Sequence, residues 1–65
     1  MLLKNLKHTR LSRLMTQREL AAKAGVSPTT VNRLETQEQP AEIRTIRKLA
    51  AALDVEAEQL IGATP

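Results

Sequence analysis

Apolar residues recur along the chain at the three- and four-residue spacing of amphipathic helices, and no stretch alternates apolar with polar residues as a strand does. A chain of 65 residues has room for one core. We therefore predict an all-α single domain over residues 1–65. Its five helices are expected at about 2–13, 17–24, 28–35, 42–53 and 56–61.

Two of the predicted apolar stripes define most of the expected core. The fourth segment carries the longest stripe, which begins at Ile43 and ends at Leu53. In the first segment Leu6 shares a face with Arg10, and Leu14 continues that face just beyond the segment. An arginine on an apolar face either extends its charge to water or pairs with an acidic group inside the fold.

Start and stop signals bound the second and third segments. Thr16 and Glu19 have the spacing of a capping box, and Gly25 suits the left-handed conformation that ends a helix. Ser27 is a favoured cap, and Pro28 follows it in the first helical position, where its missing N–H costs nothing. Two short helices thus meet at a tight turn.

The residues around this turn have the spacing of a helix-turn-helix. Ala21 is small enough for the point where the two helices cross, and Gly25 can adopt a positive φ in the turn. Apolar side chains that would lock the second helix onto the first are Leu20, Val26, Val31 and Leu34.

Here the sequence resembles a known family, the Cro and cI phage repressors and the wider XRE-like regulators. The resemblance runs from Leu3 to Ile61, and its most specific parts read T-Q-x-E-L-A-x-x-A-G-V-S…T-V-N-R-L-E and T-I-R-K-L-A-A-A-L-D-V…E-Q-L-I. It implies a lambda repressor-like fold, a compact five-helix bundle whose second helix spans the DNA backbone and whose third lies in the major groove. The implied partner is double-stranded DNA.

The third segment has a polar face suited to reading bases. On a helical wheel this face lies opposite Val31 and Leu34. Arginine pairs with guanine, asparagine with adenine, and a threonine methyl meets a thymine methyl. The alternative is an ordinary solvated helix face. The candidate base contacts are Pro28, Thr29, Asn32 and Arg33.

Other residues are candidates for phosphate contacts. In the family a glutamine at the position of Gln17 bonds a phosphate oxygen, assisted by free amides at the helix N-terminus; alternatively Gln17 is only a favourable early-helix residue. A phosphate role predicts that Gln17→Ala weakens binding to all DNA sequences alike. The remaining candidates are Arg18, Ser27, Thr30, Thr36 and Gln37.

The resemblance also implies two structural roles. Arg10 would form a buried ion pair with Glu35, which would hold the third helix in place. Leu14 and Asp54 stand where many relatives carry glycine.

Relatives usually form homodimers that read roughly palindromic operators with half-sites about 10 bp apart or a multiple of that. The candidate dimer residues are Val55, Ala57, Leu60 and Ile61, although Leu60 and Ile61 would alternatively complete the core.

Basic residues gather in the first half of the chain. Residues 1–33 carry seven basic side chains and one acidic, whereas residues 34–65 carry three basic and six acidic, for a net charge of +3. A basic half suggests a polyanionic partner, and a solvated charged surface is the alternative.

Several residue classes are missing altogether. Without cysteine the chain forms no disulfide and no thiolate site, which fits a cytoplasmic protein acting at the nucleoid. The absence of Phe, Tyr and Trp argues against binding single strands by aromatic stacking, and no stretch could span a membrane. The single histidine, His8, has no partners for a catalytic triad or a zinc site. We expect no enzymatic activity, no cofactor and no metal.

Two other functions remain open. Small proteins of this type also serve as antitoxins that bind a toxin and autoregulate their operon, because a fold does not determine a function. A purely structural or oligomerising helical module is the other. Complete absence of DNA binding at low salt would support the module, and co-purification of a second protein would support the antitoxin.

Overall fold

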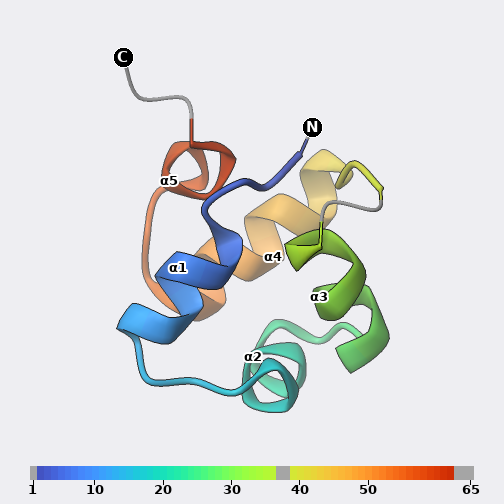
Figure 1. Cartoon of the computed structure of the whole chain (residues 1–65), viewed down its shortest axis with the longest axis vertical. Helices are drawn as coiled ribbons and strands as arrows, with labels where there is room; N and C mark the ends of the chain where they lie inside the picture. Colours follow the sequence, from blue (N-terminus) through green and yellow to red (C-terminus); the bar gives the residue numbers. More distant parts are fainter. Residues whose placement is uncertain (1, 37–38, 63–65) are drawn as a thin grey trace.

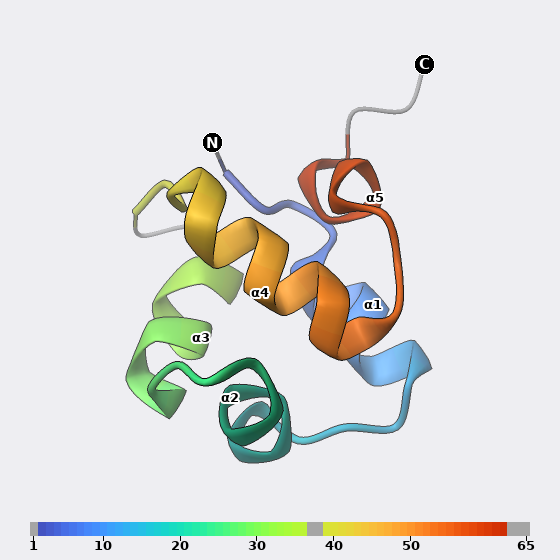
Figure 2. The same cartoon turned by 180° about the vertical axis from the view of Figure 1, so that it is seen from behind.

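The computed structural model describes residues 2–36 and 39–62, and within these residues every regular element is a helix. Helix α4 runs through the middle of the molecule, with α5 at one end of the long axis and α2 at the other (Figure 1). Seen from behind, α4 crosses in front of α1 (Figure 2). The helices are α1 (Leu6–Ser12), α2 (Gln17–Ala24), α3 (Pro28–Glu35), α4 (Ile43–Leu53) and α5 (Ala57–Ile61).

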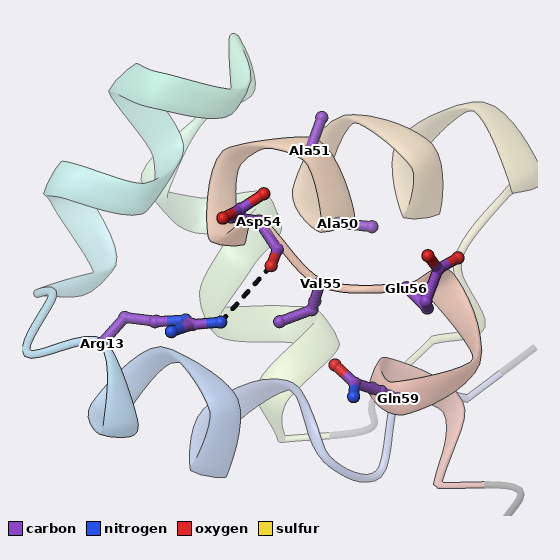
Figure 3. Close-up of a pocket in the computed structure, with 7 residues that line it drawn as sticks. All are labelled: Arg13, Ala50, Ala51, Asp54, Val55, Glu56 and Gln59. Atoms are coloured by element: carbon purple, nitrogen blue, oxygen red, sulfur yellow. Dashed lines mark hydrogen bonds between the residues drawn. The ribbon is translucent and has the colours of Figure 1, made fainter.

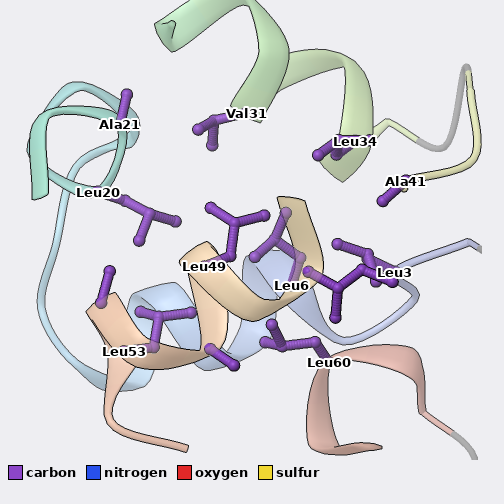
Figure 4. Packing of buried hydrophobic residues seen from close by; sticks show 13 residues of the cluster. Leu3, Leu6, Leu20, Ala21, Val31, Leu34, Ala41, Leu49, Leu53 and Leu60 are labelled. Carbon is purple, nitrogen blue, oxygen red and sulfur yellow. The ribbon is translucent and has the colours of Figure 1, made fainter. Parts of the chain in front are cut away.

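Every helix contributes a buried side chain to a single core (Figure 4). Helix α3 is anchored by Val31 and Leu34, which are 0% and 2% exposed. Leu49 of α4 is also fully buried. The all-α bundle predicted from the pattern is therefore confirmed, and the buried apolar side chains fix the direction in which α3 presents its other face.

The first helix begins at Leu6, so the prediction that it starts at residue 2 was wrong. The amide of Asn5 donates to the carbonyl of Leu60 at 3.0 Å, which ties the preceding segment to α5. Leu3 is buried from this non-helical segment. The apolar side chain of Leu3 therefore packs in the core from the segment before α1 and does not belong to an extra turn of that helix. The predicted starts at 42 and 56 also shift by one residue, because Glu42 and Glu56 are the N-caps of α4 and α5.

Two residues assigned to apolar stripes point into solvent. Leu14 is 90% exposed and Ile43 is 63% exposed. The helical spacing does not extend to Leu14, because α1 has already ended and Leu14 adopts a φ of 57°. The chain turns there, and Met15 packs against the core instead.

Among the described residues, four helices end with one residue in the left-handed conformation, and α5 does so at Gly62. After α1, the amides of Leu14 and Met15 donate back to the carbonyls of Leu11 and Arg10, at 2.9 and 3.2 Å. This pairing is the Schellman motif, which satisfies carbonyls that lack a helical partner. Gly25 and Asp54 occupy the equivalent positions after α2 and α4. Glycine is therefore the residue best suited to the position of Leu14.

Replacing Leu14 by glycine is expected to raise the free energy of unfolding. The left-handed conformation costs a leucine about 1–2 kcal/mol, and glycine avoids this cost. Glycine also loses more backbone entropy on folding, which cancels about 0.5–1 kcal/mol of the gain. A net gain of about 0.5–1 kcal/mol should appear as a rise of a few degrees in the thermal midpoint. Leu11→Gly is the control, because Leu11 lies within α1 and is 51% exposed, so it is another exposed leucine but in a helical position. It should lower the midpoint, and a fall in both variants would contradict the interpretation.

Candidate nucleic-acid interface

Helices α2 and α3 pack against each other across a turn that begins at Gly25, whose φ is 76°. Helix α2 starts at a complete capping box. The amide of Glu19 donates to Thr16 Oγ1 at 3.0 Å, and the amide of Thr16 donates to Glu19 Oε1 at 2.9 Å. The bond from the Thr16 amide to the carboxylate favours the ionised form and is the largest cause that lowers the pKa of Glu19. The capping box thereby fixes the first turn of α2.

The start of α3 is fixed by its own cap. Ser27 Oγ accepts from the amide of Thr30 at 3.1 Å and lies 2.8 Å from the Thr30 hydroxyl. Pro28 occupies the first turn, as its sequence position predicted. Ser27 is exposed and Thr30 is half-buried, so their hydroxyls lie at the edge of the helix N-terminus.

The polar face of α3 is turned outward. Its four candidate base-reading side chains are all exposed, while Val31 and Leu34 on the other side are buried. This is the orientation that the helical wheel predicted. Contact of these residues with bases stays a prediction. The exposed face comprises Pro28, Thr29, Asn32 and Arg33.

The structure brings Arg10 and Glu35 together in a buried, two-point ion pair. Arg10 Nε donates to Glu35 Oε2 at 2.5 Å and Nη2 donates to Oε1 at 3.1 Å. The third guanidinium nitrogen donates to the carbonyl of Met15 at 2.6 Å. The two side chains are 8% and 2% exposed. Hydrogen bonding to Glu35 raises the pKa of Arg10 above its already high ordinary value. The pair ties α1 to the end of α3.

Gln17 is joined to the same ion pair and to the outward face of α3. Its Nε2 donates to Glu35 Oε1 at 3.0 Å and to Asn32 Oδ1 at 3.3 Å. Sequence reasoning missed this connection. The available signal was that Asn32 and Glu35 lie three residues apart on α3, so a side chain that reaches one also reaches the other.

The other candidate phosphate contacts lie around this face. Arg18 is exposed in the first turn of α2. Thr36 is exposed at the end of α3, and its hydroxyl donates to the carbonyl of Arg33 at 3.1 Å. Gln37 lies outside the described residues.

The candidate dimer residues separate into two groups. Leu60 is 0% exposed within one chain, so its assignment to a dimer surface was wrong and it belongs to the core. Val55, Ala57 and Ile61 are half-buried and pack against the core.

Val55 also borders an open pocket of about 330 Å³ between the end of α4 and α5 (Figure 3). Arg13 forms one wall of this pocket. Its Nε donates to the carbonyl of Leu53 at 3.0 Å and its Nη2 to that of Asp54 at 3.3 Å. These bonds join the end of α1 to the C-terminus of α4.

Neither a metal centre nor a membrane span is found in the described part of the chain. Residues 2–36 and 39–62 contain no group of three histidine, cysteine or acidic side chains placed to hold a metal ion. No helix among them is both long and apolar enough to cross a bilayer.

Comparison with known proteins gives one family and similar solved structures. A family model described as Helix-turn-helix matches residues 6–60. The restriction-modification controller protein C.AhdI from Aeromonas hydrophila is 31% identical, with a TM-score of 0.82 over 85% of this chain and 83% of that chain. The hypothetical transcription factor NHTF from Neisseria is 35% identical, with a TM-score of 0.81 over 88% of this chain and 64% of that one. No curated protein sequence matches the chain.

Proposed function

The chain belongs to the helix-turn-helix family of the XRE and Cro/cI type, whose members are DNA-binding transcription regulators, and we propose that it is a sequence-specific repressor. The observation that carries this proposal is the orientation of α3. Its apolar side is buried and its polar side is exposed next to the capped N-terminus of α2. A helix presented in this way fits the major groove of B-DNA.

In the proposed complex the exposed side of α3 reads base edges. Arg33 would pair with a guanine and Asn32 with an adenine, while Thr29 and Pro28 would make van der Waals contacts, including one to a thymine methyl. The ion pair of Arg10 and Glu35 would assist base recognition, because it holds the C-terminal end of α3 in place.

Phosphate contacts would fix the register of the protein on the duplex. Arg18 and the main-chain amide of Gln17 lie in the first turn of α2, where amides have no helical partner. Hydroxyl groups at both ends of α3 would add hydrogen bonds to the sugar-phosphate backbone. The hydroxyl groups proposed for these contacts belong to Ser27, Thr30 and Thr36, and the side-chain amide of Gln37 is proposed to add a further contact.

We also propose that two copies bind a roughly palindromic operator. The half-buried side chains of Val55, Ala57 and Ile61 would form the contact between copies. Helix α5 lies at the opposite end of the long axis from α2, so a contact through α5 would leave the exposed side of α3 free (Figure 1). Enzymatic activity forms no part of the proposal, since His8 is exposed on α1 and has no catalytic partner in the sequence.

Selection from a random pool of duplex DNA tests the proposal. At about 50 mM salt the protein should enrich one site with two-fold symmetry, and raising salt to about 200 mM should weaken binding by orders of magnitude. The control is the triple variant Thr29→Ala, Asn32→Ala and Arg33→Ala, which should bind DNA without enriching a site. Failure of the wild-type protein to enrich any site would refute sequence-specific binding.

A further inference from the structure

We propose that Gln17 is a positioning residue that sets the direction of the Asn32 side-chain amide and thereby selects the base that Asn32 reads. The inference rests on the proposed function, because it concerns the DNA-reading side of α3. Its basis is a chain of hydrogen bonds that starts at the buried Arg10 and ends at the protein surface.

The polarity of this chain is set at its buried end. An arginine guanidinium carries only donors and does not deprotonate in proteins. Its two hydrogen bonds to Glu35 require acceptors at both carboxylate oxygens, so Glu35 is ionised and only accepts. The side chain of Glu35 is 2% exposed, which leaves water little access to alter this arrangement.

The ionised carboxylate dictates how the amide of Gln17 is oriented. Glu35 Oε1 accepts at 3.0 Å, and only Nε2 of Gln17 can donate to it. A Gln17 amide turned by 180° would place its own oxygen against the carboxylate, with two acceptors facing each other. Nε2 has two hydrogens, and its second is directed to Asn32 at 3.3 Å.

Asn32 must in turn present Oδ1 to Gln17. Turned the other way, its NH₂ group would face the NH₂ group of Gln17, and neither could accept. With Oδ1 held at one lone pair, the second lone pair and both Nδ2 hydrogens remain for a ligand. Donation to Oδ1 also polarises the amide and strengthens Nδ2 as a donor.

A fixed amide direction has a consequence for base recognition. Asparagine pairs with adenine by donating to N7 and accepting from N6, so donor and acceptor must appear in one order along the groove. Rotation of the amide by 180° exchanges that order and suits a different pattern of donors and acceptors on the base pairs. Gln17 therefore opposes the wrong orientation and favours one base at the position that Asn32 reads.

The hydrogen bonds of Gln17 Nε2 also distinguish the positioning role from a phosphate contact by the Gln17 side chain. Both hydrogens of Nε2 are used within the protein, so the side chain has none left for a phosphate while it holds Asn32. A side chain that bound phosphate would affect all sequences alike. A side chain that positions Asn32 affects one base position.

The test compares Gln17→Met with Arg18→Met in selections from the same random duplex pool, with Asn32→Ala identifying the position that Asn32 reads. Methionine keeps the length of the side chain and removes its hydrogen-bond donors. Gln17→Met should reduce the preference at that position by on the order of 10-fold and leave the other positions unchanged. Arg18→Met should weaken binding and leave every preference intact, because Arg18 is an exposed cation outside the chain of hydrogen bonds.

The outcomes separate this proposal from the proposed function. If the wild-type protein selects a site but Gln17→Met weakens all sequences alike, Gln17 is a phosphate contact and only the positioning role is overturned. If the wild-type protein selects no site, both are overturned.

In the free protein, nuclear magnetic resonance should show the side-chain amide hydrogens of Gln17 exchanging with water more slowly than those of Asn32. Equal rates would also overturn the positioning role.

Discussion

Replacing Glu35 by alanine is expected to lower the free energy of unfolding by about 3–5 kcal/mol, because it leaves the buried charge of Arg10 without its partner. Only the carbonyl of Met15 would still accept from the guanidinium. A domain of this size has a total stability of about 3–10 kcal/mol at typical values per residue. The variant should therefore be partly unfolded near room temperature, as measured by urea titration followed with circular dichroism.

Two further variants show whether the loss comes from the unpaired charge. Glu42→Ala removes an exposed carboxylate that makes no capping bond, so it should change stability by less than about 0.5 kcal/mol. The double variant Arg10→Met with Glu35→Leu removes both charges and should recover most of the loss, since apolar replacements of buried pairs are often neutral. An unchanged midpoint for Glu35→Ala would mean that the pair contributes nothing to stability.

Replacing Arg33 by alanine is expected to weaken binding to the selected DNA site by about 1–3 kcal/mol, which is roughly 5- to 150-fold in Kd. Arg33 is exposed on the side of α3 opposite Val31, where its fork of donors would meet a guanine. The same variant should accept other bases at one position of the site. Fluorescence anisotropy with the selected duplex and its single-base variants measures both effects.

Lys23→Ala is the matched control for a lost positive charge. Lys23 is exposed near the end of α2, where it borders a pocket with Arg13 and Leu53, and it has no place on the outward side of α3. Its replacement should change affinity a few-fold at most and leave base preference intact. Equal affinity of Arg33→Ala and the wild-type protein for the selected site would remove Arg33 from the set of base readers.

Local signals predicted the helix-turn-helix better than they predicted the ends of the chain. The capping box at Thr16 and the pair of Ser27 and Pro28 are complete within four residues, and the bounds of α2 and α3 agree with them. The non-helical segment before α1 is bonded to α5 through Asn5 and Leu60, and this bond forms only when the folded chain brings the two together. Helical periodicity alone could not reveal that contact.

The features of the candidate site also differ in how far the sequence could predict them. The exposed and buried sides of α3 follow from helical geometry, and the pair of Arg10 and Glu35 followed from the resemblance to the family. The bonds from Gln17 to Asn32 and Glu35 depend on the distance between the start of α2 and the end of α3. That distance is set by side-chain packing across the turn, which a single sequence does not specify.

The backbone amide of Asn5, which donates to the carbonyl of Leu60, can report when α5 separates from the rest of the domain. That amide can exchange its proton for deuterium only when α5 separates from the N-terminal segment or the whole domain opens. Because α5 carries side chains proposed to join two copies, the exchange rate of this amide should fall as protein concentration rises. A single resonance would then follow self-association without any DNA present.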